Sequence, residues 1–269
     1  VVHLSPTYTQ LAGVAANLGA RLRPVPLDAD DGWRLDTEAL AQAVTARCRI
    51  VSIVNPNNPT GSLLSPTEVE AVIDAAQGVG AWLLVDEVYA GAEQADGPPT
   101  PTLFGRYERT ICLGSLSKAY GLPGLRCGWA VADPALLQDL WRRHEYATIS
   151  AGALANRLAA LALSAAVQPR LLARARQLVR AGFETLSGAL AEVPEALSII
   201  PPGASAVGFV RCHHESADDF TARLRDEDGI LVVPGSCFGD DRHFRFCFGL
   251  SPDQLQPGLS GIVAQARSG

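Results

Sequence analysis

The sequence predicts an α/β protein, in which a mostly parallel β-sheet covered by helices on both faces is followed by a smaller C-terminal α+β domain. Short apolar runs alternate with helical patterns along the first part of the chain, which is the rhythm of strands joined by crossover helices. After the break at Pro201-Pro202-Gly203 the pattern changes to short strands flanked by helices. We therefore expect a large domain over residues 1–168, and a bridging helix with a small domain over residues 169–269.

The large domain begins with a short strand that ends at Tyr8 and a helix that Gly19 ends. Ser65 starts another helix with a capping box, because Glu68 follows three residues later and Pro66 takes the first helical position. The other expected strands are 21–27, 49–54, 81–85, 110–113 and 126–132, and the other expected helices are 35–47 capped by Asp36, 152–166 and one that begins at Asp133-Pro134.

The small domain is reached through a long amphipathic helix from Pro169 to about Val193. A second capping box, formed by Ser251 and Gln254, marks the start of the last helix. The expected strands are 206–211, 230–233 and 244–248, and the expected helices are 216–228 and 252–266.

Composition excludes several classes of protein. A hydrophobic fraction of 48% with 19% charged residues is typical of a globular domain, and the net charge of -6 argues against a nucleic-acid partner. No apolar run reaches the roughly 18 residues that a membrane helix needs, so no membrane partner is expected. Cys112, Cys127 and Cys247 fall in apolar runs and are interpreted as reduced core residues of a cytoplasmic protein. Cys212-His213-His214 has no second cluster to complete it, so no metal site is predicted.

Polar side chains follow three of the expected strands at the point where each strand ends. They are Asn58, the pair Asp86 and Tyr89, and Lys118. The carboxyl ends of parallel strands meet at one edge of a sheet, and ligands bind there. We therefore expect these side chains to converge. Taken singly, each also has an ordinary interpretation, since Asp86 could cap a turn, Tyr89 could pack in the core, and Asn58 is a common turn residue.

The loop after the strand 110–113 has a composition that suits an anionic cofactor. Ser115 and Ser117 can donate hydrogen bonds to phosphate oxygens, and Arg126 can bind the same oxygens with two parallel N–H groups. Lys118 lies between them and can form an imine with an aldehyde once its amine is deprotonated.

Three segments of the sequence resemble one protein family. The segment Ser-x-Ser-Lys-x-x-Gly-x-x-Gly-x-Arg over residues 115–126 resembles the cofactor-lysine segment of the class I/II aminotransferases, which are fold-type I enzymes that use pyridoxal 5'-phosphate (PLP). Asn-Pro-x-Asn-Pro-Thr-Gly over residues 55–61 and Asp-Glu-Val-Tyr over residues 86–89 resemble two further signatures, in the order that the family has them.

The resemblance implies a PLP-transferase fold of type I and a role for each candidate. Lys118, Asp86 and Tyr89 would form the catalytic set. Lys118 would be the Schiff-base lysine that moves a proton at the substrate Cα, and Asp86 would pair with the pyridine nitrogen so that the ring can accept electrons. The other implied cofactor contacts are Tyr8 stacked on the ring, Asn58 and Tyr89 at the ring oxygen, and Ser115, Ser117 and Arg126 at the phosphate.

Arg245 is expected to bind the substrate. It is a single cation in the apolar run 244–248, and arginine is rarely buried without a partner. A structural ion pair would be the ordinary explanation. The family resemblance implies instead that Arg245 holds the substrate α-carboxylate as a bidentate pair, with Asn58 beside it.

The function that the resemblance implies is transamination, in which a homodimeric enzyme moves an amino group between an amino acid and a 2-oxo acid. Two alternatives stay open. The tract 143–149 and the loop 121–126 resemble capreomycidine synthase-like cyclases, which would make the protein a PLP-dependent lyase or cyclase. The other alternative is a PLP-sensing domain of a transcription regulator.

The resemblance covers this chain from the middle of the family's large domain to its C-terminus. The sequence contains no methionine and opens at Val1. It also lacks the family's N-terminal phosphate-binding helix start and its cross-subunit tyrosine. We therefore expect a chain without its N-terminal part, a site open on one side with apolar surface uncovered, and negligible transamination from residues 1–269 alone.

Overall fold

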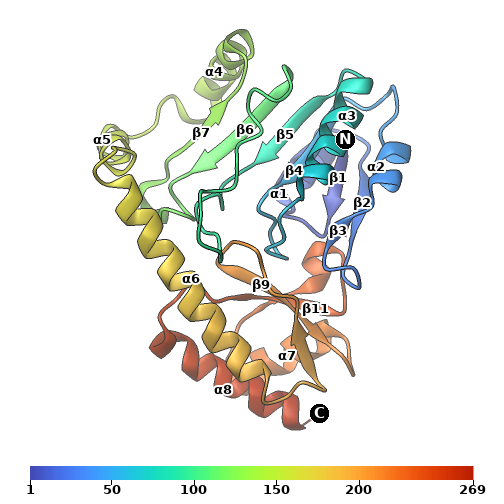
Figure 1. Ribbon diagram of the computed structural model, residues 1–269, viewed down its shortest axis with the longest axis vertical. Coiled ribbons are helices and arrows are strands. Elements are labelled where there is room, and N and C mark those ends of the chain that lie inside the picture. The colour runs from blue at the N-terminus through green and yellow to red at the C-terminus, as the bar shows by residue number, and fades with distance from the viewer. Residues whose placement is uncertain (269) are drawn as a thin grey trace.

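The computed structural model describes residues 1–268, which form two parts joined by one long helix (Figure 1). The strands of the larger part are β1 (Val2–Ser5), β2 (Arg23–Asp28), β3 (Arg34–Leu35), β4 (Ile50–Val54), β5 (Trp82–Asp86), β6 (Thr110–Ser115) and β7 (Gly128–Val131). Its helices are α1 (Gln10–Asn17), α2 (Thr37–Ala43), α3 (Pro66–Gly78), the short 3₁₀-helix η1 (Pro123–Leu125), α4 (Pro134–Thr148) and α5 (Ala153–Ala162).

The large sheet has the strand order β3-β2-β1-β4-β5-β6-β7. All pairs from β2 to β6 are parallel, and only the edge strands β3 and β7 run antiparallel to their neighbours. The prediction of a mostly parallel sheet is therefore confirmed. The strand order reverses at β1, which has β2 on one side and β4 on the other. Crevices that bind ligands open at such reversals.

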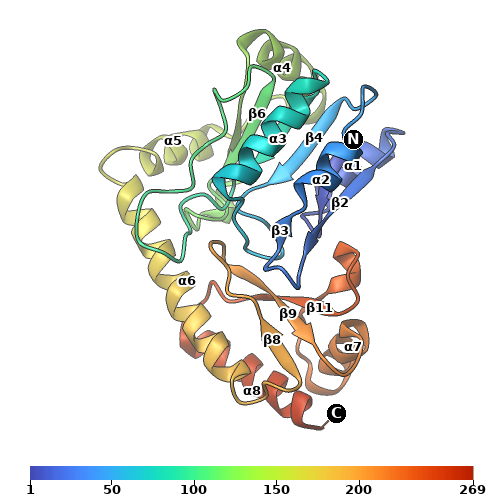
Figure 2. The ribbon, with the colours of Figure 1, turned by 45° about the vertical axis from the view of Figure 1, so that its right-hand side comes forward.

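The two faces of the large sheet are covered to different degrees. Leu40 of α2 and Val72 of α3 are fully buried against the strands on one face. Helix α1 lies on the opposite face, behind the sheet in Figure 1, and neither α1 nor α4 contains a buried residue. Figure 2 shows α2 and α3 in front of the sheet.

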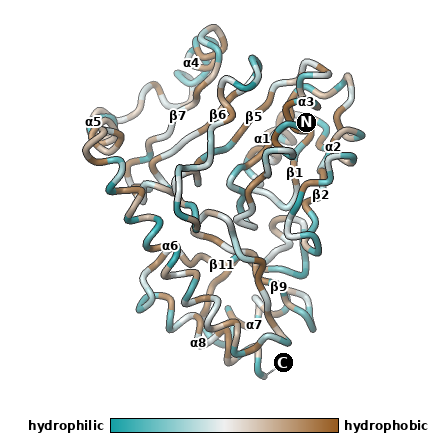
Figure 3. Tube along the Cα trace, in the orientation of Figure 1, coloured by the Kyte–Doolittle hydropathy of each residue, from teal (hydrophilic) through white to brown (hydrophobic). Residues whose placement is uncertain are grey.

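Large apolar side chains are exposed near the β7 edge. Tyr146 is 95% exposed, and Trp141, Ile149 and Leu154 also face solvent from α4, its end and α5. Figure 3 shows the hydrophobic colour along the central strands and also along parts of these outer helices. The expectation of uncovered apolar surface on the open side of the site stays a prediction.

The smaller part is an antiparallel sheet packed against three helices. Its strands are β8 (Leu197–Ile199), β9 (Val207–Cys212), β10 (Val233–Pro234) and β11 (His243–Cys247), in the order β10-β11-β9-β8. The helices are α6 (Gln168–Leu190), α7 (Ala217–Asp228) and α8 (Pro252–Ser268), with a 3₁₀-helix η2 (Gly235–Phe238). Phe220, Phe244 and Leu259 are among its fully buried core residues.

Most predicted helix starts are confirmed. Asp36 and Asp133 accept N-terminal backbone N–H groups, and Ser65 forms the complete capping box with Glu68. The capping box predicted at Ser251 is only half formed. Gln254 Oε1 accepts from both the Ser251 backbone N–H and the Ser251 hydroxyl, so that hydroxyl points to the glutamine side chain instead of accepting from the helix backbone.

Some predicted elements are shorter in the structure. The helix predicted over 35–47 is α2, because Val44 adopts an extended backbone that ends the helix. The strand predicted over 230–233 is reduced to β10, where Pro234 has no N–H for a longer ladder. No helix among the described residues is long and apolar enough to cross a membrane.

Helix α6 joins the two parts. Near its start, Gln168 Nε2 donates to the Tyr120 hydroxyl and Arg174 donates to the Tyr120 carbonyl. Near its end, Leu186 and Leu190 belong to the core of the small sheet. The helix is therefore shared between the two parts, and the domain boundary at residue 168 stays a prediction.

The close approach between α6 and the end of β11 depends on Gly182. A Cβ atom at this position would lie 1.8 Å from the Phe248 carbonyl oxygen, which is backbone and cannot move aside. We expect Gly182→Ala to lower the free energy of unfolding by about 3 kcal/mol or more. Urea denaturation measures this. Gly188→Ala is the matched control, because Gly188 lies in the same helix with no atom within 4 Å of the added Cβ and should be neutral or stabilising. Equal midpoints for the two variants would contradict the prediction.

Candidate active site

The three loops with polar candidates meet at the carboxyl ends of β4, β5 and β6. Val54 pairs with Asp86, and Asp86 pairs with Leu113, so these strands end side by side. In Figure 1 the arrowheads of β5 and β6 point toward the small sheet. The convergence of the strand-end residues predicted from the sequence therefore follows from the register of the sheet.

Asp86 is a buried carboxylate at the end of β5. Its Oδ1 accepts one hydrogen bond, from the Val88 backbone N–H at 3.0 Å. Burial raises the pKa of the Asp86 carboxyl above its ordinary value, and the positive charge of Lys118 acts in the opposite direction. A buried carboxyl that accepts one backbone hydrogen bond has little to offset the cost of burying its charge. It therefore suits a cationic N–H donor as its partner.

Tyr89 lies on the turn after β5 and is 4% exposed. Burial is the main cause that raises the pKa of its phenol to about 12, with Cys247 adding to the rise and Arg245 opposing it. The phenol therefore stays protonated near neutral pH and can donate a hydrogen bond. Cys247, which was expected in the core, is exposed instead, because it occupies the end of β11 at the margin of this site.

Arg245 reaches from the small sheet to the turn after β4. Its Nη1 donates to Oδ1 of the buried Asn58 at 3.2 Å. Its guanidinium also lies over the Phe238 ring, 5.2 Å from the centroid. Arg245 is half-buried and forms no ion pair among the described residues, so a structural ion pair does not explain its position. The contact fixes the Asn58 amide with its oxygen toward Arg245, which leaves its NH₂ group for another acceptor.

The Lys118 side chain is exposed and has neither a hydrogen bond nor an ion pair with any described residue. Lys118 is also the one lysine in the sequence, because the other basic residues counted with it are all arginines. The loop around it is held by its serines. The Ser115 hydroxyl lies 3.0 Å from that of Ser117 and donates to the Cys127 carbonyl at 3.2 Å. The two ends of the loop are thereby tied together.

Arg126 is placed by an unusual backbone conformation. Its φ of 47° lies in the left-handed region, which non-glycine residues rarely adopt. One guanidinium nitrogen donates to the Pro123 carbonyl at 3.0 Å, and the side chain is otherwise exposed. Because the Ser115 hydroxyl bonds the carbonyl of the next residue, Cys127, the arginine and the two serines border the same loop.

Tyr8 is 37% exposed after the end of β1. It influences the Tyr89 phenol electrostatically, which places it at the same end of the sheet. The preceding residue, Thr7, donates from Oγ1 to Asn57 Oδ1 at 3.0 Å. The structure thus brings the Tyr8 segment to the Asn58 turn, and a role in stacking stays a prediction.

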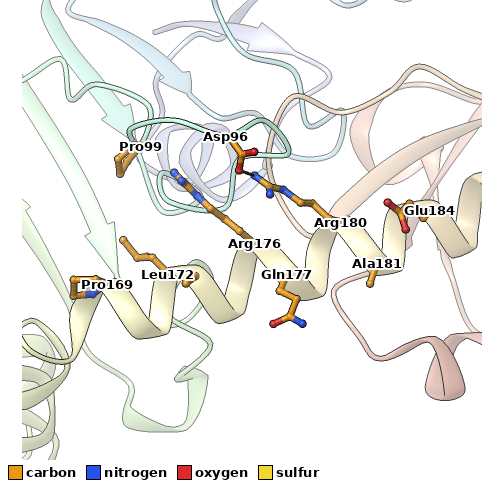
Figure 4. Close-up of a pocket in the computed structure, with 10 residues that line it drawn as sticks. Asp96, Pro99, Pro169, Leu172, Arg176, Gln177, Arg180, Ala181 and Glu184 are labelled. Carbon is orange, nitrogen blue, oxygen red and sulfur yellow. Dashed lines mark ion pairs between the residues drawn. The ribbon is translucent and has the colours of Figure 1, made fainter.

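A buried ion pair behind Tyr89 was not anticipated from the sequence. Arg176 of α6 contacts Glu93 Oε2 at 2.6 Å and donates to the carbonyls of Gly91 and Gly97. Figure 4 shows Arg176 beside Arg180, which pairs with Asp96, along a groove of about 610 Å³. None of the predicted site residues lines this groove. The pair instead fastens the loop after Tyr89 to α6. Contacting residues so distant in sequence carry no local pattern that could have revealed them.

The charge of Glu93 should make a measurable, pH-dependent contribution to the free energy of unfolding. Burial alone would raise the pKa of its carboxyl, but the N–H groups of Gly91 and Thr100 and the Arg176 guanidinium outweigh it and lower the pKa. The stability from this charge is therefore complete above the ordinary value of 4.5 and is lost as pH falls through the lowered one. We expect the gap in unfolding free energy between the native protein and Glu93→Gln to shrink over that interval.

The matched control for this measurement is Glu192→Gln. Glu192 pairs with Arg267 at 2.7 Å, but both side chains are 56% exposed, so its loss should cost at most about 1 kcal/mol. Urea titrations at several pH values below 6 give both gaps. A Glu93→Gln gap that does not change with pH would contradict the assignment.

Other candidates from the sequence lie elsewhere. His213 is hydrogen-bonded to Ser198, away from the strand ends, and no group of three or more His, Cys, Asp or Glu side chains within residues 1–268 could hold a metal ion. The tract 143–149 lies along the exposed helix α4 and its end, where His144 stacks on Trp141.

Comparison with known proteins agrees with this arrangement. The family model for aminotransferase class I and II matches residues 1–262. The chain is 34% identical over 266 residues to capreomycidine synthase of Streptomyces vinaceus, covering 97% of this chain and 67% of that protein. It is also 34% identical over 247 residues to an aromatic amino acid aminotransferase of Rhodococcus jostii strain RHA1, covering 90% and 64%.

A solved structure gives the same result for the fold. A PLP-dependent aminotransferase from Streptococcus suis 89-1591 superposes with a TM-score of 0.90 at 32% identity, covering 99% of this chain and 70% of that one. The chain thus spans about two thirds of the length of the proteins it matches. The two-part architecture is that of the fold-type I PLP enzymes. Within them, the chain belongs to the class I and II aminotransferase family, as its signatures indicate.

Proposed function

We propose that the protein is a PLP-dependent aminotransferase that moves an amino group between an amino acid and a 2-oxo acid. The observation that carries the proposal is the approach of Arg245 from the small sheet to Asn58, at the strand ends where Asp86, Tyr89 and Lys118 also lie. A guanidinium that could bind a carboxylate thereby lies at the edge of the parallel sheet from which the Lys118 loop also starts.

The side chains at this edge fit the cofactor. The Asp86 carboxyl has a raised pKa and one backbone donor, which suits the pyridine N–H. Protonated Tyr89 and the NH₂ group of Asn58 can donate to a ring oxygen. Two serine hydroxyls and an exposed guanidinium border the Lys118 loop and suit a phosphate. When bound there, PLP supplies an acceptor for the electron pair released at the substrate Cα.

Each residue then has a task that its surroundings support. Lys118, whose amine has no partner among the described residues, would hold the cofactor aldehyde and move the proton at Cα. Arg245 would bind the substrate carboxylate and so fix which Cα bond is aligned for cleavage. Asn58 accepts from Arg245, so substrate binding at that guanidinium would also alter the amide at the ring.

The test is an amino-transfer assay of the protein made from its whole reading frame, with PLP and a panel of amino acids and 2-oxo acids. Formation of the 2-oxo acid from the donor, matched by the amino acid from the acceptor, is expected for at least one pair. Absence of both products across the panel, with PLP bound, would reject transamination. The substrate, a homodimer and a cytoplasmic location stay predictions.

A second candidate is a PLP-dependent cyclase or lyase, because a relative at 34% identity is a capreomycidine synthase. The tract 143–149 gives this candidate no support, since it lies at the exposed α4 helix. The same assay separates the two. A cyclase consumes its amino acid without producing a 2-oxo acid, a lyase can release a 2-oxo acid, and neither needs an amino acceptor or converts one into an amino acid.

A further inference from the structure

The buried side chain of Asn57 forms hydrogen bonds with two loops that are far apart in sequence. It is 3% exposed and lies in the turn after β4. Its Nδ2 donates to the Pro6 carbonyl at 3.0 Å and to Thr60 Oγ1 at 2.8 Å, and its Oδ1 accepts from Thr7 Oγ1 at 3.0 Å. Both N–H bonds and the oxygen of the amide are therefore used, a combination of donors and acceptor that a carboxylate or a hydroxyl cannot supply.

The main chain holds Asn57 firmly in its own turn. Its N–H donates to the Ser62 carbonyl at 2.9 Å, and its carbonyl accepts from the Gly61 N–H at 3.0 Å. Two of its three side-chain partners, Pro6 and Thr7, belong to the other loop, after β1. The side chain thus connects one fixed turn to a second segment.

That connection occurs where the sheet itself stops holding the loops together. Strands β1 and β4 are paired only at Val2 with Val51 and at His3 with Ser52. Beyond this register, β1 leads into α1 and β4 leads into α3, which lie on opposite faces of the sheet (Figure 1). Loops that leave toward opposite faces have no ladder to fix their separation. Asn57 spans this gap with side-chain hydrogen bonds.

The residues that flank the bridge are both candidates for cofactor contact. Tyr8 follows Thr7 directly, and Asn58 follows Asn57 directly. The Asn58 amide is oriented by Arg245, and the segment of Tyr8 is held at the Asn58 turn by the hydrogen bond from Thr7 to Asn57. We infer that Asn57 is a positioning residue that holds the Tyr8 segment against the Asn58 turn, so that both side chains contact the cofactor ring as one unit. This inference rests on the proposed function.

Two conservative substitutions break different hydrogen bonds of the bridge, which is the connection of the Asn57 side chain to Pro6 and Thr7. Asn57→Asp keeps the acceptor for Thr7 but removes both donations from Nδ2. Thr7→Val removes only the hydroxyl that donates to Asn57. We expect the dissociation constant of PLP to rise by about 10- to 100-fold in Asn57→Asp, which leaves buried groups unpaired, and by about 3- to 10-fold in Thr7→Val. Ser62→Ala is the matched control, because the Ser62 hydroxyl contacts Thr60 in the same turn and does not reach the other loop.

A second readout distinguishes positioning from plain structural support. The absorbance of lysine-bound PLP changes with pH. A hydrogen-bond donor held at the ring oxygen keeps the midpoint of this pH titration low. Loosening Asn58 should therefore move the midpoint to higher pH in both bridge variants and leave it unchanged in Ser62→Ala. Thermal melting of each protein without PLP serves as the measure of folding.

The outcomes separate this inference from the proposed function. Weaker PLP binding with a raised midpoint in both bridge variants supports positioning. Lower melting temperatures with an unchanged midpoint, or PLP binding equal to that of the native protein, overturn it while transamination stands. A native protein that binds no PLP overturns the proposed function, and this inference with it.

Discussion

Replacing Lys118 with alanine should lower the rate of amino transfer by about 10⁴-fold, at the upper end of what acid–base catalysis contributes. The Lys118 side chain has no hydrogen bond or ion pair among the described residues, so its removal should leave the loop folded. Lys118 also follows β6, the strand next to the one that ends at Asp86, and its charge opposes the rise in the pKa of the Asp86 carboxyl that burial causes. Rates of product formation with saturating PLP and substrate measure the loss.

Lys118→Arg is the matched variant for this experiment. Arginine keeps the positive charge, but it cannot be deprotonated and so cannot attack an aldehyde. It should be as inactive as the alanine variant. Because Lys118 is the one lysine within residues 1–269, borohydride reduction of PLP-bound protein should place the label of this part of the chain on Lys118. Substantial activity in Lys118→Arg would show that charge alone matters, and would contradict the assignment.

Replacing Arg245 with alanine should weaken binding of the amino acid and leave PLP binding nearly unchanged. The loss of a charge-assisted bidentate pair costs about 2–5 kcal/mol, which corresponds to an increase of about 30-fold to several thousand-fold in KM. Arg245→Lys should recover only part of the affinity, because an ammonium group cannot form the two parallel bonds. KM for the amino acid and Kd for PLP are measured on the same preparations.

Arg242 provides the control for Arg245. It precedes the same strand by one residue, is exposed, and contributes its backbone N–H to Asp240. Arg242→Ala should therefore leave KM within about threefold of the native value. If both variants raised KM equally, the effect would reflect the net charge of the small sheet, and the specific contact would be rejected.

Local pattern was sufficient for most of the fold. Strands such as β4 and β5 are continuous apolar runs, and helices such as α3 carry their own start signals, so periodicity located them. The strands β3 and β8 were missed because two or three residues cannot establish a period. Cys247 was misplaced because an apolar run does not reveal which of its positions ends at a sheet margin.

In the candidate site, the residues could be predicted from local pattern, but the contacts between them could not. Asn58, Asp86 and Lys118 follow strands directly, so the order of elements predicted their convergence. The contacts that orient them are tertiary. Arg245 meets Asn58 across 187 positions, and Arg176 meets Glu93 across 83. No local pattern could have shown these pairs, nor that Asn57 joins two loops.

Helix α6 has a mechanical consequence. Its 23 residues extend about 35 Å, with Tyr120 of the Lys118 loop held at one end and the core of the Arg245-bearing sheet at the other. Within the helix, Arg176 forms an ion pair with Glu93 in the loop that follows Tyr89. The helix therefore connects the two parts through contacts at both of its ends, and we expect a movement of the small sheet relative to the large one to displace the Lys118 loop as well.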